Sequence, residues 1–183
     1  MRGAGELLGD EQSGHVAAVG FELYVEMLEE AVAELSGRRH ATPRPLRVDA
    51  RIDAYIPAGY VSSEALKIDL HRRLALVEDE DELRELEGSC EDRFGPLPEP
   101  VGNLFAIQRA KLDLAQIEAD YLVYRDGRVS VGPLVLGSGE LRELKTRVGT
   151  AVYSSSKREL TLRGSSFAAA RELLVAILAA RRA

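Results

Sequence analysis

The spacing of hydrophobic residues changes twice along this chain of 183 residues, and no other feature limits the fold as strongly. Apolar and charged residues alternate from Leu46 to Ala54, which predicts a strand with one buried face. From Ser63 to Ala115 the apolar residues recur at helical spacing, and after Asp120 short strand-like stretches return in pairs. Strands grouped beside helices, rather than regular alternation of the two, predict an α+β fold with antiparallel hairpins packed beside helices.

Three helices are predicted in the middle of the chain. Ser63 can cap the first, whose apolar stripe holds Leu66, Leu70, Leu74 and Val77. The second runs from Glu78 to about Arg93, with Asp79 and Glu82 as a capping pair, and the break from Phe94 to Pro98 ends it. Pro98 or Pro100 opens the third. Its buried side is expected to hold Val101, Leu104, Phe105, Leu112 and Ala115, interrupted by Gln108.

Two hairpins and two helices are predicted in the remaining sequence. Asp120–Tyr124 and Val129–Val131 flank Asp126-Gly127, a pair typical of a primed turn. We expect a short strand at Leu134–Leu136 and a helix from Ser138 to Val148. A second hairpin follows at 151–153 and 160–162. The final helix is capped by Ser165 or Ser166, and its stripe includes Phe167, Leu174 and Ile177.

The first residues are rich in glycine and follow no strand or helix that could position them. Four glycines stand between Met1 and His15, and glycine adds entropy that folding must remove. We expect Met1 to be an addition and Arg2 onward to come from a larger protein; a natural flexible tail is the alternative. An amphipathic helix, Val16–Leu35, forms an N-terminal extension. The predicted organisation is a segment 1–37, a proline-containing linker 38–45 and a domain 46–183.

Composition excludes several classes of function. A net charge of −6 argues against a dedicated nucleic-acid surface, and the basic run from Arg38 to Arg44 is interpreted as linker. Cys90 is the only cysteine, so a reducing compartment fits, and its acidic neighbours disfavour a thiolate. We find no bilayer-spanning stretch and no signal peptide, and therefore expect a cytoplasmic protein without a membrane partner.

A search for chemistry leaves one notable feature. The chain has no phosphate-binding glycine loop, and its three histidines lie far apart, so no cofactor and no catalytic residue are predicted. Nine of the residues from Glu78 to Asp92 are acidic and only Arg84 is basic. These carboxylates could be a solvated face, a docking surface for a basic partner, or a cation site formed by Asp79, Asp81, Glu82 and Glu85.

Two sets of motifs together resemble the bacterial transcription-repair coupling factors, the Mfd family. Arg2–Gly9, Gln12–Gly14 and Val19–Tyr24 resemble the end of that family's translocase module, a motif shared with the branched-DNA translocase RecG. The more specific set resembles the family's C-terminal domain: Asp53–Pro57, Arg72–Ala75 and Asp92–Pro98. Segment 1–37 would then be the end of the translocase module, and 46–183 the regulatory domain.

The resemblance implies a role for each part. Arg2 and Gln12 match polar positions of the TRG motif, which couples ATP-driven lobe movement to DNA translocation. The C-terminal domain is expected to dock on the UvrB-like domain of the same protein, to mask recruitment of UvrA, and to restrain the motor until RNA polymerase is engaged. RNA polymerase and DNA would be bound by the missing parts of the parent. The partner-docking candidates are Glu85, Glu87, Glu91 and Asp92. Ser89 stands where some members have an acidic residue.

Two other functions remain open from the residues alone. One is an enzyme that uses the carboxylates between Asp79 and Asp92; the other is a nucleic-acid-binding module that uses Arg2, Arg38, Arg39 and Arg44. Tyr55, Ile56 and Phe94 are expected to be core residues without a binding role.

Overall fold

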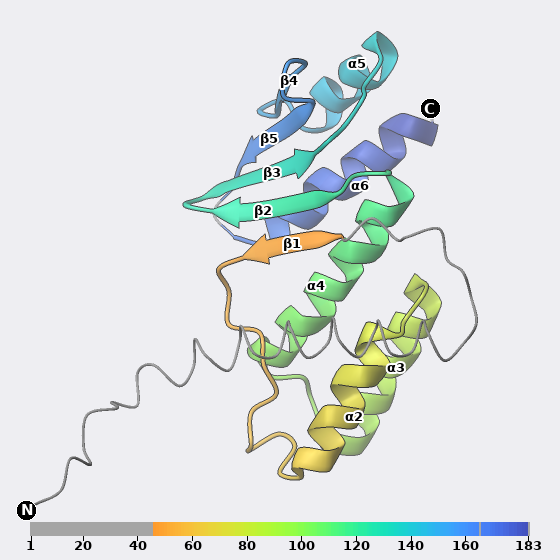
Figure 1. Ribbon diagram of the computed structural model, residues 1–183, viewed down its shortest axis with the longest axis vertical. Helices are drawn as coiled ribbons and strands as arrows, with labels where there is room; N and C mark the ends of the chain where they lie inside the picture. Colours follow the sequence, from red (N-terminus) through yellow and green to blue (C-terminus); the bar gives the residue numbers. More distant parts are fainter. Residues whose placement is uncertain (1–45, 165, 183) are drawn as a thin grey trace, which may run out of the picture. The chain divides into compact units, whose positions relative to one another are not determined.

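The computed structural model describes residues 46–164 and 166–182, all within one compact unit. These residues form five helices and a five-stranded mixed sheet, an α+β arrangement that confirms the predicted class (Figure 1). In chain order the elements are β1 (Arg47–Ala50), α2 (Glu64–Ala75), α3 (Glu80–Phe94), α4 (Glu99–Gln116), β2 (Tyr121–Arg125), β3 (Arg128–Gly132), α5 (Ser138–Arg147), β4 (Val152–Ser154), β5 (Glu159–Arg163) and α6 (Ala168–Arg182). The predicted helix 16–35 and the segment before it lie outside the described residues.

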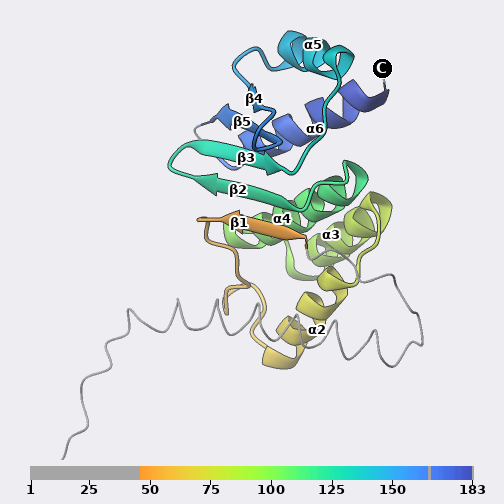
Figure 2. The same cartoon turned by 45° about the horizontal axis from the view of Figure 1, so that its top comes forward.

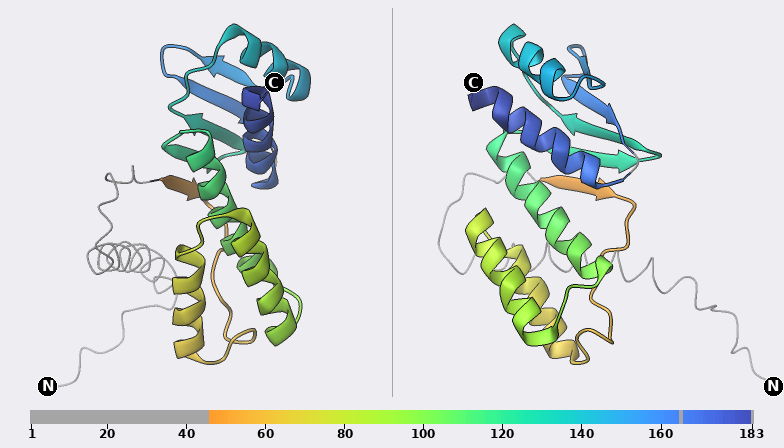
Figure 3. Two further views of the ribbon diagram at one scale, coloured as in Figure 1. Left: turned by 90° about the vertical axis from the view of Figure 1, so that its right-hand side faces the viewer. Right: turned by 180° about the vertical axis from the view of Figure 1, so that it is seen from behind.

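The sheet has the strand order β1-β2-β3-β5-β4. β1 pairs in parallel with β2, whereas the other neighbours pair antiparallel. Asp126 and Gly127 join β2 to β3 with φ values of 51° and 67°, as a primed turn requires. α4 and α6 lie on the same face of the sheet, as the tilted view (Figure 2) and the views from the side and from behind (Figure 3) show.

The core consists of two hydrophobic clusters that share α4. Val101 and Phe105, near the start of α4, belong to a cluster with α2 and α3. Ala110 and Leu114, further along, belong to the larger cluster under the sheet with α5 and α6. Leu174 and Ile177 are fully buried in this second cluster, as predicted for the final helix. α4 is therefore the element that joins the helical half of the domain to the sheet half.

The structure corrects two of the predicted strands. β1 ends at Ala50 rather than Ala54, because the N–H of Ile52 turns back to the carbonyl of Ala50. Leu134–Leu136 is not a strand. The Leu134 N–H donates to the Arg158 carbonyl, and its own carbonyl accepts from the Tyr153 hydroxyl. These isolated bonds hold an irregular apolar segment against the core instead of extending a ladder.

Two predicted core positions are also wrong. Ala115 is exposed and Leu114 is buried in its place, because the second half of α4 turns its apolar side toward the sheet cluster. Tyr55 is 54% exposed, and its neighbour Ile56 takes the buried position. Phe94 packs against the helical cluster as expected. Within the described ranges, no helix is both long and apolar enough to span a membrane.

Candidate docking surface on α3

The first turn of α3 uses several of its own carboxylates to begin the helix. Asp79 Oδ1 accepts from the N–H groups of Asp81 and Glu82 at 3.0 and 2.9 Å, and Glu82 Oε2 accepts from the N–H of Glu78 at 2.9 Å. This reciprocal arrangement satisfies N–H groups that a helix start leaves without partners. Asp81 pairs with Arg84 at 3.2 Å. These groups are thus engaged within the helix, which argues against the cation-site alternative.

The inward side of α3 is fixed by one arginine of α4. Arg109 Nε donates to both oxygens of Glu80 at 2.9 and 3.0 Å, and one terminal nitrogen donates to Glu87 at 2.9 Å. The Arg109 side chain is only 13% exposed. Burial alone would lower its pKa, but the hydrogen bonds with Glu87 and Glu80 outweigh this and raise the pKa. Glu87, one of the predicted docking residues, therefore holds α3 in place from within the domain.

The end of α3 is fixed by Tyr60, from the loop before α2. Its hydroxyl donates to the carbonyls of Cys90 and Gly95 at 3.2 and 3.0 Å. Its ring meets that of Phe94 edge-on, with centroids 5.7 Å apart. Burial raises the pKa of the Tyr60 hydroxyl, which keeps the proton needed for these bonds. Together, Arg109 and Tyr60 determine which side of α3 faces outward.

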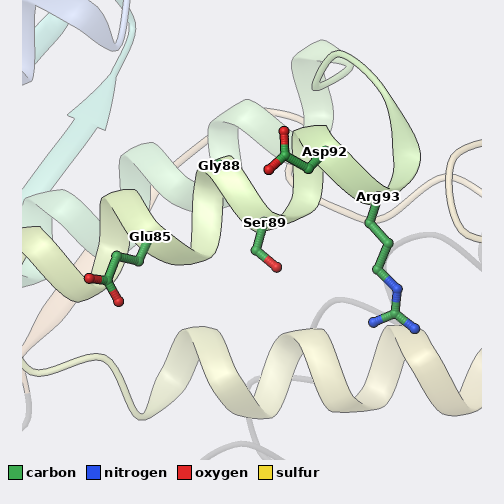
Figure 4. A pocket seen from close by; sticks show the side chains of 5 residues that line it. All are labelled: Glu85, Gly88, Ser89, Asp92 and Arg93. Atoms are coloured by element: carbon green, nitrogen blue, oxygen red, sulfur yellow. The ribbon is translucent and has the colours of Figure 1, made fainter.

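The outward side of α3 forms a shallow hollow, lined by Glu85, Gly88, Ser89, Asp92 and Arg93 (Figure 4). Their spacing places them along one face of the helix. Glu85, Asp92 and the neighbouring Glu91 are exposed, and no Lys or Arg among the described residues forms an ion pair with them. Three of the four predicted docking carboxylates thus remain available to a partner, and small residues between Glu85 and Asp92 allow a close approach.

The other candidates from the sequence are placed as follows. Arg2, Gln12, Arg38, Arg39 and Arg44 lie outside the described residues. Cys90 is buried, and burial raises its pKa further from the thiolate range. His71 has its pKa lowered by burial and by Lys67. No group of three or more His, Cys, Asp or Glu in the described ranges is arranged to hold a metal ion.

Comparison with known proteins shows which family this domain resembles. Residues 50–132 match the family described as TRCF domain, a range that includes all of α3 and α4. Residues 50–132 therefore form a domain of the transcription-repair-coupling factor family. Its relatives of that name include those of Mycobacterium bovis, 40% identical over 123 residues, Staphylococcus epidermidis, 41% over 114, and Bacillus subtilis, 40% over 113.

The chain spans about 10% of the length of these transcription-repair-coupling factors, and the first two matches each cover 61% of it. A crystal structure titled as the C-terminal domain of transcription-repair coupling factor has the same fold. That structure has a TM-score of 0.64 at 21% identity and covers 75% of this chain and 95% of its own. The α+β domain is therefore the C-terminal fold of this family.

Two residues that position the surface were missed in the sequence. Arg109 follows Gln108 in the helical pattern of α4, and that pattern predicts a helix without indicating that Arg109 pairs with α3. The available signal was the charge imbalance from Glu78 to Asp92, because nine carboxylates with one internal arginine need cations from another element. Tyr60 carried no comparable signal.

Proposed function

We propose that this domain is a non-catalytic regulatory module of a transcription-repair-coupling factor. It docks through the outward face of α3 on the UvrB-like N-terminal domain of the same protein. Docking masks the surface that recruits UvrA and restrains the ATP-driven DNA translocase until RNA polymerase is engaged. The observation that carries the proposal is the pair of exposed carboxylates, Glu85 and Asp92, on either side of Gly88 and Ser89.

The geometry suits a reversible contact. Glu85, Glu91 and Asp92 are exposed, so an ion pair with a basic partner stabilises by about 1 kcal/mol or less each. Within one protein, a linker raises the effective concentration to about the millimolar range, so even a modest interface stays closed. A larger partner can then open it by contributing a few kcal/mol. Rigid support from Arg109 and Tyr60 reduces the ordering that docking requires.

Binding of the 183-residue chain to the separately expressed UvrB-like domain tests the proposal. Calorimetry at low and moderate salt should show weak binding that falls as salt rises. Asp92→Lys should weaken it about tenfold, because attraction becomes repulsion. Glu172→Lys makes the same charge change at an exposed position of α6 and should leave the affinity unchanged. Salt-independent binding, or no binding at high micromolar concentration, would contradict docking through this face.

The opening segment extends the proposal to the motor. In the intact protein, Arg2 and Gln12 would hydrogen-bond to a moving lobe and couple ATP hydrolysis to translocation. Arg2→Ala or Gln12→Ala in the full-length protein should abolish DNA translocation while ATP binding persists. Loss of ATP binding would instead indicate a structural role for these residues.

A further inference from the structure

The face of the sheet opposite α4 and α6 is covered by no helix or strand of the described residues (Figure 3). Inward positions of the strands are buried, among them Leu122, Val129 and Leu160. Because successive side chains point to opposite faces, the open face holds the alternate positions. The Tyr121 hydroxyl confirms this, since it reaches Glu159 at 3.0 Å and lies over Gly132, where a Cβ would be only 2.7 Å away.

A row of arginines crosses one end of this open face. The register pairs Arg125 with Arg128, and Arg128 with Arg163, so three arginines stand side by side on β2, β3 and β5. All three are exposed. Like charges placed directly opposite one another destabilise a sheet. The arrangement therefore opposes stability, which favours a role in binding an anion.

Nearby acids neutralise this row only in part. Asp49 on β1 accepts from Arg125 and, at 3.2 Å, from Arg47. Asp126, in the turn between β2 and β3, is a second acid at this end. Among the described residues, no carboxylate forms an ion pair with Arg128 or Arg163. Two guanidinium groups thus face solvent with their donors available.

Basic and acidic residues are also distributed unevenly along the chain. Residues 1–92 contain 10 Lys and Arg against 21 Asp and Glu, whereas residues 93–183 contain 14 against 9. β2, β3 and β5, which carry the arginine row, lie in the basic half. Such asymmetry is typical of chains that bind an anionic polymer through one part.

We propose that this open face binds the phosphate backbone of a nucleic acid. The row spans about 10 Å across three strands, a length over which one strand of a duplex presents about three phosphates. Guanidinium groups bind phosphate oxygens in pairs of hydrogen bonds. Ser130 and Thr161, in the adjacent row, contact each other at 3.5 Å, and Thr161 donates to Glu159 at 3.4 Å, so the arginines supply the donors for phosphate. Tyr121, the aromatic residue of the described strands that lies on the open face, is hydrogen-bonded to Glu159, so contacts to the nucleic-acid backbone, independent of sequence, are expected.

Fluorescence anisotropy of labelled DNA oligonucleotides, single- and double-stranded, tests this on the full chain. Weak binding is expected at low salt, falling steeply as salt rises. The double variant Arg128→Glu and Arg163→Glu should lose at least about tenfold in affinity, with a shallower salt dependence because two phosphate contacts are gone. The matched control Arg142→Glu and Lys145→Glu changes net charge equally on α5, away from the open face, and should lose less than about twofold.

Three results would overturn the proposal. One is the absence of binding at low salt, and another is an equal loss in the two double variants. The third involves poly-glutamate as an alternative ligand. If the chain binds poly-glutamate more tightly than DNA, and only the Arg128 and Arg163 changes remove that binding, the face would be assigned to an acidic protein. Circular dichroism of each variant shows whether the fold is intact, so a folded variant with lost affinity supports the proposal.

Discussion

Burial separates the charged residues of this domain into supporting and exposed groups. The largely buried Arg109 donates hydrogen bonds to the partly buried Glu80 and Glu87, and these bonds fix α3 on α4. Glu85 and Asp92 project from the other side of the same helix and are exposed, whereas Glu91, four residues after Glu87, is exposed beside the supporting group. The same residue type thus supports the helix on one side and remains available for binding on the other.

Replacement of Arg109 by Met should destabilise the domain strongly. The partly buried Glu87 would lose its cation, and the partly buried Glu80 would keep only the more exposed Arg84, at 3.3 Å, while the apolar volume is kept. Breaking a buried pair in this way costs about 3–5 kcal/mol, and partial exposure of both glutamates lowers the expectation to about 2 kcal/mol. Urea unfolding measures the change. Arg142→Met, at an exposed position, is the control and should shift stability by less than about 0.5 kcal/mol.

Asp113 of α4 should make stability depend on pH in the direction opposite to a salt-bridged aspartate. Burial raises its pKa, as does Glu80, although Arg171 and Arg109 act against this. A carboxyl with a raised folded pKa binds its proton more tightly in the native state, so stability falls as pH rises from about 3.8 through the raised value. Asp113→Asn should therefore be more stable than the parent at pH 7.5, with the difference narrowing toward pH 4. A difference that widens on acidification would contradict this account.

Local sequence patterns predicted single helix caps and turns well, whereas contacts between elements far apart in the sequence could not be predicted from them. The Ser63 and Asp79 caps and the Asp126-Gly127 turn depend on neighbouring residues, and the structure contains all three. The parallel pairing of β1 with β2 depends on residues more than 70 positions apart. Leu134–Leu136 has the composition of a strand, but Leu134 bonds to the Arg158 carbonyl and the Tyr153 hydroxyl instead of to a strand ladder. The spacing of apolar residues and their strand propensity identify an apolar segment. Its tertiary contacts decide whether it pairs with another strand in a sheet.

The two helix caps should differ in strength. Asp79 makes two bonds to N–H groups at 3.0 and 2.9 Å, while Ser63 makes one at 3.5 Å to Leu66. Asp79→Ala should cost about 1 kcal/mol, and the charge of Asp79 near the helix start adds to this. Ser63→Ala should cost less than half as much. Thermal unfolding of both variants provides the comparison, and equal losses would mean that the Asp79 bonds contribute no more than the longer Ser63 contact.

At the scale of the whole molecule, the net charge does not show where charged residues of one sign cluster. A net charge of −6 predicted an acidic protein and directed attention to α3, which the structure does present outward in part. The arginines of the open sheet face were missed because Arg125, Arg128 and Arg163 meet only through strand register. The Asp126-Gly127 turn could have placed Arg125 opposite Arg128 in advance. Arg163 required knowledge of a pairing between separate hairpins.

The two halves of the domain should unfold together, because α4 belongs to both hydrophobic clusters. Leu83 lies in the helical cluster and Leu160 in the sheet cluster, and both are almost completely buried. Leu83→Ala and Leu160→Ala should each cost about 2–5 kcal/mol, and each should lower the midpoint of one common transition. Urea unfolding followed by circular dichroism, with hydrogen exchange read separately at α2 and β3, measures both halves. Leu76→Ala, at a position 48% exposed, is the control and should cost less than about 1 kcal/mol. If Leu83→Ala released α2 at a urea concentration where β3 stays protected, α4 would not transmit stability between the clusters, and α3 could undock while the sheet remained folded.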